Sequence, residues 1–187
     1  MTNCHQSHAI MSRCSNVLYP PSVFFIDFEA FQHGAEDFSI KELCVIDMAR
    51  PMKQLYYLYL PPCSWDSLNR DQKRSYSYEY LHLHKLSWDE GYARFCAACL
   101  RRDMQNWLFP TTNRETSVFY VMGRQKADYL QRLLPDLKFV NYQEAFNVAS
   151  LKELCALPSH VRCIHRVHGE HCAMLKCYRM YMHFMSL

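Results

Sequence analysis

The pattern of apolar and polar positions predicts that the chain begins with three β-strands. Apolar runs rich in aromatic and β-branched residues cover residues 22–31, 40–48 and 54–60, and short connectors join them. Such residues favour strands, and short connectors favour antiparallel neighbours. We therefore expect a three-stranded antiparallel meander.

Helical periodicity follows a polar and aromatic stretch, residues 63–80, that is expected to be a loop. Ser87 and Glu90 have the spacing of a capping box, with Ser at the N-cap and Glu at N3. An apolar stripe at helical spacing then runs from Trp88 to Trp107. Together these signals predict a helix over residues 88–108.

The remainder alternates short strands and short helices. Strands are expected at 117–122 and 138–142, and helices at 126–134, 151–157 and about 170–184. The order β-β-β-α-β-α-β-α-α fits a central mixed sheet with helices packed on its faces. Residues 1–21 are polar, rich in Ser and closed by Pro20-Pro21, and are expected to form a flexible arm before one domain over 22–187.

Composition narrows the class of protein. The chain has 187 residues, of which 50% are hydrophobic and 14% aromatic, enough for one domain with a real core. Only 4 glycines are present, which excludes glycine-rich phosphate loops, and the net charge of +3 permits a nucleic-acid partner without requiring one. Neither a signal-peptide pattern nor a long apolar run is visible, so we expect an intracellular protein, nuclear or cytoplasmic, with mostly reduced cysteines.

Two carboxylates stand out on the first predicted strand. Asp27 and Glu29 are two residues apart, so their side chains point from the same face of the strand. Phe25 and Phe28 are among the apolar residues around them. Two neighbouring carboxylates in apolar surroundings repel each other unless a cation lies between them. The pair therefore marks a present or former metal-dependent site.

With these elements in this order, the chain resembles the DEDDh 3′–5′ exonuclease superfamily of the ribonuclease-H-like fold over about residues 22–184. The resemblance rests on Asp27-x-Glu29, on the capped helix after the third strand, on the strand 117–122 followed by Asp128, and on His171 opening the last helix. It implies an α/β fold: a ribonuclease-H-like mixed sheet with helices on both faces.

The same resemblance implies a catalytic site. Asp27, Glu29 and Asp128 would bind two Mg²⁺ or Mn²⁺ ions, which activate water and stabilise the leaving oxygen, and His171 would be the general base. A further Asp is expected five residues after that His, where this chain has Lys176. A cation at this position removes a ligand and repels a metal pair, so the site is expected to be degenerate.

Cysteine and histidine residues are concentrated between residues 163 and 183. Cys163, His168 and Cys172 are candidates for three ligands of a tetrahedral zinc ion, and His171 or a glutamate from elsewhere is the candidate for the fourth. Cys172 falls at the start of the last helix, where the helix dipole favours a thiolate. The alternative is a cysteine-rich core helix preceded by a polar loop.

A degenerate acid set beside a candidate zinc site is similar to Maelstrom domains, which resemble DEDDh exonucleases but carry a Glu-Cys-His-Cys zinc site. The Cys–His spacing here is not the usual one for that family, and Asp27 and Glu29 persist. This second resemblance implies binding of RNA, with partners among RNA-silencing proteins.

The leading hypothesis is thus an exonuclease-derived domain, zinc-stabilised and catalytically degenerate, that binds single-stranded RNA or DNA. The alternatives are an active Mg²⁺- or Mn²⁺-dependent 3′–5′ exonuclease and a protein-interaction module without nuclease chemistry. No membrane contact and no small-molecule cofactor are expected. Solvated faces account for clusters of basic residues more often than binding sites do. The alternative is a phosphate track with stacking positions, for which the candidate residues are Lys73, Arg74, Arg101, Arg102, Arg124, Lys126, Arg132, Tyr76, Tyr78 and Tyr80.

Overall fold

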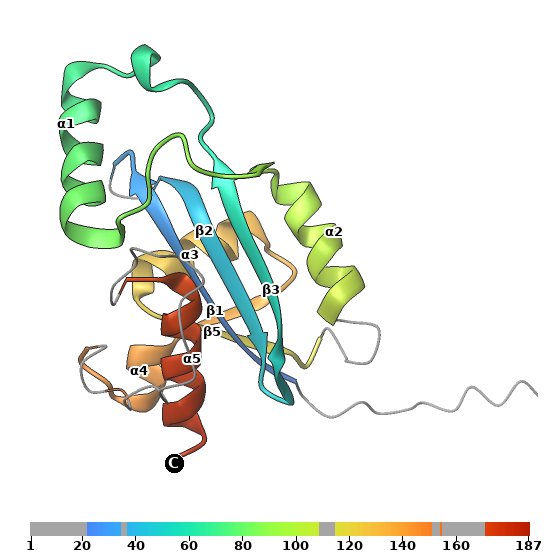
Figure 1. Ribbon diagram of the computed structural model, residues 1–187. Helices are drawn as coiled ribbons and strands as arrows, with labels where there is room; N and C mark the ends of the chain where they lie inside the picture. The colour runs from blue at the N-terminus through green and yellow to red at the C-terminus, as the bar shows by residue number, and fades with distance from the viewer. Residues whose placement is uncertain (1–21, 35–36, 109–114, 151–153, 155–170) are drawn as a thin grey trace, which may run out of the picture.

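A six-stranded mixed sheet forms the centre of the computed structural model, which describes residues 22–34, 37–108, 115–150, 154 and 171–187 (Figure 1). The strand order is β4-β3-β2-β1-β5-β6. The strands are β1 (Val23–Gln32), β2 (Phe38–Asp47), β3 (Arg50–Leu60), β4 (Ala93–Arg94), β5 (Val118–Val121) and β6 (Lys138–Asn141). The expected α/β class with a mixed sheet is confirmed.

The first three strands form the expected antiparallel meander. β1 pairs with β2, opposing Asp27 to Cys44 and Glu29 to Glu42, and β2 pairs with β3. On the other side of β1, strand β5 runs parallel to it, and β6 runs parallel to β5. β1 is therefore a central strand, with neighbours on both sides.

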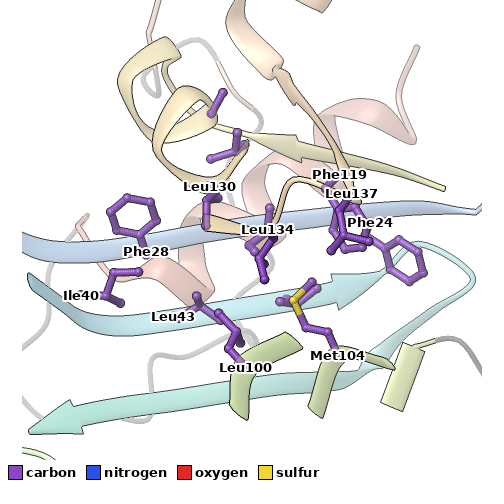
Figure 2. Close-up of a cluster of buried hydrophobic side chains, with 14 of the residues drawn as sticks. Phe24, Phe28, Ile40, Leu43, Leu100, Met104, Phe119, Leu130, Leu134 and Leu137 are labelled. Atoms are coloured by element: carbon purple, nitrogen blue, oxygen red, sulfur yellow. The ribbon is translucent and has the colours of Figure 1, made fainter. Parts of the chain in front are cut away.

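Helices pack on both faces of this sheet. They are α1 (Arg70–Glu79), α2 (Ala97–Leu108), α3 (Arg124–Leu133), α4 (Tyr142–Phe146) and α5 (Ala173–Phe184), with the short helices η1 (Trp65–Ser67) and η2 (Tyr80–His84) on either side of α1. Residues of α2 and α3, such as Leu100 and Leu130, share one buried cluster with Phe24 and Phe28 of β1 (Figure 2). Residues of α5, such as Met180, share a second cluster with Phe25. Successive β1 side chains thus alternate between the two cores.

Two expectations about the middle of the chain are wrong. The expected loop at 63–80 contains α1, which begins with a capping box: Asn69 Oδ1 accepts from the N–H of Gln72, and the Gln72 side chain accepts from the N–H of Asn69. This helix is polar and buries only Tyr76 and Glu79, so it lacks the apolar stripe by which a sequence predicts a helix. Tyr76 joins Phe31 and Trp88 in a third cluster that ties α1 to the end of β1.

The helix expected from Ser87 starts later. Residues 88–90 form a turn, Gly91 has a φ of +145°, and residues 93–94 pair with β3, so α2 begins only at Ala97. A β-carbon at Gly91 would lie 2.5 Å from the carbonyl carbon of Tyr59. The close approach of two backbones, which a sequence pattern does not encode, therefore displaces the helix start.

Some expectations fall outside the described residues. These are the arm at 1–21 and, except for the buried Leu154, the helix at 151–157. Within the described ranges, no helix combines the length and apolar character needed to cross a membrane.

Candidate functional site

A buried charge cluster lies on the face of the sheet that α5 covers. Asp27 and Glu29 of β1 are 0% and 8% exposed, in a sheet whose neighbouring β1 residues are apolar. Two lysines approach them, Lys126 from α3 and Lys176 from α5. We call these four residues the charge cluster; it contains two negative and two positive groups.

The lysines bind the carboxylates directly. Lys126 Nζ lies 2.5 Å from Asp27 Oδ1 and 3.7 Å from Glu29 Oε1, and it also donates to the carbonyl oxygen of Phe28. Lys176 Nζ donates to Glu29 Oε1, and the side chains of that pair are only 8% and 10% exposed. Glu29 is therefore bridged between α3 and α5.

Electrostatics keep Glu29 and Lys176 ionised. Burial raises the pKa of Glu29, but the charges of Lys126 and Lys176 outweigh it, and the net pKa is lowered. Burial lowers the pKa of Lys176, but Glu29 and Asp27 outweigh it and hold that pKa well above its usual value. For Asp27 the balance reverses, because burial and the repulsion from Glu29 together outweigh the attraction of Lys126 and Lys176, and the pKa is raised.

This arrangement already supplies the cations that two buried carboxylates require. A divalent ion at Asp27 and Glu29 would have to displace an ammonium group or lie beside two of them, and like charges at such distances repel strongly in a buried site. One polar atom in the cluster stays unused: Asp27 Oδ2 is buried and has no hydrogen-bond partner among the described residues.

The other expected catalytic residues are placed differently. Asp128 is exposed on α3 and lies two residues after Lys126, about 200° further around the helix. The structure thus brings Lys126, and not Asp128, to the carboxylate pair. His171 is partly buried and lies two residues before the first residue of α5. Sequence reasoning identified Lys126 only as a surface phosphate contact, because the rotation of α3 relative to β1 has no local signal.

Another buried carboxylate, outside the charge cluster, holds the start of α5. Glu42 of β2 is 0% exposed and accepts hydrogen bonds from Tyr56 Oη at 3.0 Å, from Cys172 Sγ at 3.2 Å and from the N–H of Ala173 at 3.0 Å. Cys172 is the N-cap of α5 but makes no side-chain capping bond, so Glu42 caps the helix from the sheet. A negative charge is favourable at this end of a helix dipole.

The predicted zinc site is only partly within the described residues. Cys163 and His168 lie outside them, and His171 lies next to Cys172 in the chain. Cys172 contacts Glu42, which is a candidate for the glutamate that the sequence left unspecified. Across the described part of the chain, no group of three or more His, Cys, Asp or Glu is arranged to hold a metal ion. Zinc binding stays a prediction, with Glu42 added to its ligand set.

The candidate phosphate track divides into engaged and available residues. Several of its members pair with acids or are buried: Arg101 with Asp136, Arg102 with Asp103, Arg124 with Glu144, Lys126 in the charge cluster, and Tyr76 of α1 in the core. Four other members, Lys73, Arg74, Tyr78 and Tyr80, lie with Arg70 and His82 on a surface of α1 and η2, which we call the α1–η2 surface.

Aromatic rings are accessible on the α1–η2 surface. Tyr78 and Tyr80 are 59% and 41% exposed, and the Tyr78 ring lies 4.6 Å from that of His82. A pocket of about 240 Å³ opens beside Tyr80 and is also lined by Trp65, Trp88 and Asp89. Positive charge next to exposed rings is the combination that binds single-stranded nucleic acid.

No protein-family model matches the chain, and no curated protein matches it.

Proposed function

We propose that this chain is an exonuclease-derived, ribonuclease-H-like domain that has exchanged its metal site for an internal ion-pair cluster and binds single-stranded RNA. The main support is the position of Lys126 and Lys176 on Asp27 and Glu29. These ammonium groups bind the carboxylate oxygens that two-metal catalysis would use.

The topology supports the derivation from a nuclease fold. An antiparallel meander is extended by parallel strands next to β1, and helices cover both faces. Asp27-x-Glu29 sits on that central strand, and Lys176 stands on the last helix, at the position where the resemblance expects the missing Asp. Asp27, Glu29 and the position of Lys176 therefore meet at one place in the fold.

The same cluster argues against the alternative of an active exonuclease. Two-metal hydrolysis needs carboxylates free to bind ions and open coordination positions for water and the leaving oxygen. Here Glu29 accepts from Lys176 and lies 3.7 Å from Lys126, while Asp128 is exposed on the other side of α3. We accordingly expect no Mn²⁺-dependent degradation of a labelled single strand.

The α1–η2 surface is the proposed RNA interface. Lys73 and Arg74 supply charge for the phosphates, and Tyr78 and Tyr80 supply rings on which bases stack. Stacking of one base on an aromatic ring is worth about 1–3 kcal/mol, and each phosphate contact contributes to the salt dependence of binding. RNA is favoured over DNA by the Maelstrom resemblance alone.

Zinc fits the proposal as a structural ion. Cys172 and Glu42 supply a sulfur and an oxygen ligand type, and the nearby sequence contains Cys163 and His168. Bound zinc would fix the segment before α5 to strand β2 without taking part in chemistry.

Fluorescence anisotropy with a labelled single-stranded RNA tests the interface. Tyr78→Ala is expected to weaken binding about 5- to 150-fold, the equivalent of 1–3 kcal/mol. The plot of log affinity against log salt has a negative slope. The double variant Lys73→Ala/Arg74→Ala is expected to make this slope less steep by about 1.4, at roughly 0.7 per phosphate contact.

Lys138→Ala is the matched control, because Lys138 is exposed on the edge strand β6. Equal binding by all variants would refute the assigned surface. Equal affinity for single-stranded DNA of the same sequence would remove the preference for RNA. Strand cleavage that requires Asp27 would refute the proposed loss of catalysis.

A further inference from the structure

A cysteine pair at the start of α2 belongs neither to the charge cluster nor to the α1–η2 surface. Cys96 immediately precedes Ala97, the first residue of α2, and Cys99 follows in the first turn, in the arrangement Cys-x-x-Cys. Both thiols are exposed. The N–H of Cys99 donates to Cys96 Sγ at 3.4 Å, and the N–H of Leu100 donates to the carbonyl oxygen of Cys96 at 2.9 Å. Cys96 thus lies at the N-terminus of the helix and faces Cys99.

The two thiols have unequal environments. The side-chain hydrogen bond from Cys99, backbone N–H groups and the charge of Arg102 lower the pKa of Cys96. The same hydrogen bond raises the pKa of Cys99, which acts as its donor. Thiolates are the nucleophiles in exchange reactions, and helix N-termini and neighbouring cations favour them. Cys96 is therefore suited to attack first, and Cys99 to resolve the product.

A metal site is a weaker explanation for this pair. Zinc requires four ligands and soft ions require several thiolates. In the ranges that the structure describes, no third Cys, His, Asp or Glu joins Cys96 and Cys99 in a metal-binding group. A pair of accessible thiols that already contact each other fits two-electron chemistry instead.

We propose that Cys96 and Cys99 form a thiol–disulfide exchange site that reacts with small disulfides of the oxidised-glutathione class. The Cys96 thiolate attacks one sulfur of the disulfide, forms a mixed disulfide and releases one thiolate, which takes up a proton. The Cys99 thiolate then attacks Cys96 Sγ and releases the second thiol. The protein is oxidised by two electrons, the small disulfide is reduced to two thiols, and the two thiol protons of the protein balance the reaction.

The bond would close within the first turn of a single helix, so it would leave the rest of the fold unconstrained. A disulfide stabilises the folded state chiefly by restricting the unfolded chain, and this effect grows with the number of residues between the two cysteines. Only two residues separate Cys96 from Cys99. Oxidation is thus expected to change local thiol reactivity with little change in the melting temperature.

Mass spectrometry of the full-length protein after incubation with oxidised and reduced glutathione tests the proposal. Trypsin releases residues 95–101, which contain Cys96 and Cys99 as their only cysteines, and residues 54–70, which contain only Cys63. Cys63 is also exposed and is the internal control. The peptide 95–101 is expected to lose two hydrogen masses in excess oxidised glutathione and to regain them with a reductant.

Variants and alkylation distinguish the two roles. Under native conditions at pH 7, iodoacetamide is expected to modify Cys96 several-fold faster than Cys63, and Cys99→Ser should reduce this difference and trap glutathione on Cys96. Cys96→Ser should abolish the internal disulfide. Recovery of peptide 95–101 as a free dithiol in excess oxidised glutathione, or equal alkylation of Cys96 and Cys63, would overturn the proposal.

Discussion

Lys176→Met is the most informative perturbation of the charge cluster. It removes the ammonium group that binds Glu29 and leaves an unbranched side chain to fill the space on α5. Because the paired side chains are only 8% and 10% exposed, the carboxylate cannot be hydrated in compensation. Removing one partner of a buried ion pair costs about 3–5 kcal/mol of unfolding free energy. For a domain of this size, we expect the melting temperature to fall by roughly 6–20 °C.

The loss should depend on pH in a defined direction. In the native protein the pKa of Glu29 is lowered, so its contribution is present above the unfolded value of about 4.3 and is lost as the pH falls further. Without Lys176, burial outweighs the remaining attraction of Lys126 and the pKa of Glu29 should rise. A carboxyl with a raised folded-state pKa loses stability as the pH rises through that value. The deficit of the variant should therefore be smaller near pH 5 than near pH 8.

Urea unfolding at both pH values measures this effect, and Arg124→Met is the matched control. Arg124 and Glu144 lie 3.2 Å apart, but their side chains are 73% and 55% exposed. Breaking such a surface pair costs about 0–1 kcal/mol. The double variant Glu29→Gln/Lys176→Met should recover part of the loss. A Lys176→Met deficit no larger than that of Arg124→Met, or one equal at both pH values, would refute an ionised buried pair.

Three further substitutions test other parts of the fold. Glu42→Gln should lower the free energy of unfolding by about 1.5–3 kcal/mol, because the Ala173 N–H loses a charged acceptor. Glu42→Gln and Cys172→Ser should each lower the zinc content of the purified chain. Unchanged metal content and melting curves in both variants would exclude the predicted zinc site. Gly91→Ala should lower the free energy of unfolding by about 1–3 kcal/mol or more, because the added β-carbon would lie 2.5 Å from the backbone of Tyr59. It should also speed amide hydrogen exchange where β3 pairs with β4. An unchanged stability would contradict this close approach. Asn69→Ala should cost about 0.5–2 kcal/mol by thermal unfolding through loss of the α1 capping box, and a neutral Asn69→Ala would show that the cap contributes little.

The parts of the fold that could be predicted are those with a local signal. Runs of aromatic and β-branched residues predict the meander, and residue spacing alone places Asp27 and Glu29 on one face of the first strand. Helix α1 lacks such a signal, because it is polar and its capping box uses Asn69 and Gln72 in place of a Ser–Glu pair. The start of α2 has no local signal either, because it depends on the pairing of β3 with β4.

The candidate site depended on tertiary information in the same way. The sequence shows that Lys176 departs from the expected acid, but the contact of Lys176 with Glu29 requires the packing of α5 on β1. The sequence does not distinguish Asp128 from Lys126 as the residue that reaches the carboxylates, because the rotation of α3 has no local signal and two positions along a helix reverse the direction of a side chain. Glu42 has no sequence signal, because nothing in its sequence context distinguishes it from a solvated strand residue.

The neutral charge cluster also limits how this protein can change over evolutionary time. Substituting any one of its four residues with an uncharged side chain leaves an uncompensated charge in a buried position, which is costly. Substitutions that survive are therefore expected to come in opposite-charged couples, Asp27 with Lys126 and Glu29 with Lys176, each joined by a direct contact between a carboxylate and an ammonium group. When homologous sequences are aligned, these couples should be retained or exchanged together. Conversion of the cluster into a metal-binding acid set would require several coordinated replacements, so the ion pairs, once present, resist replacement by a metal site.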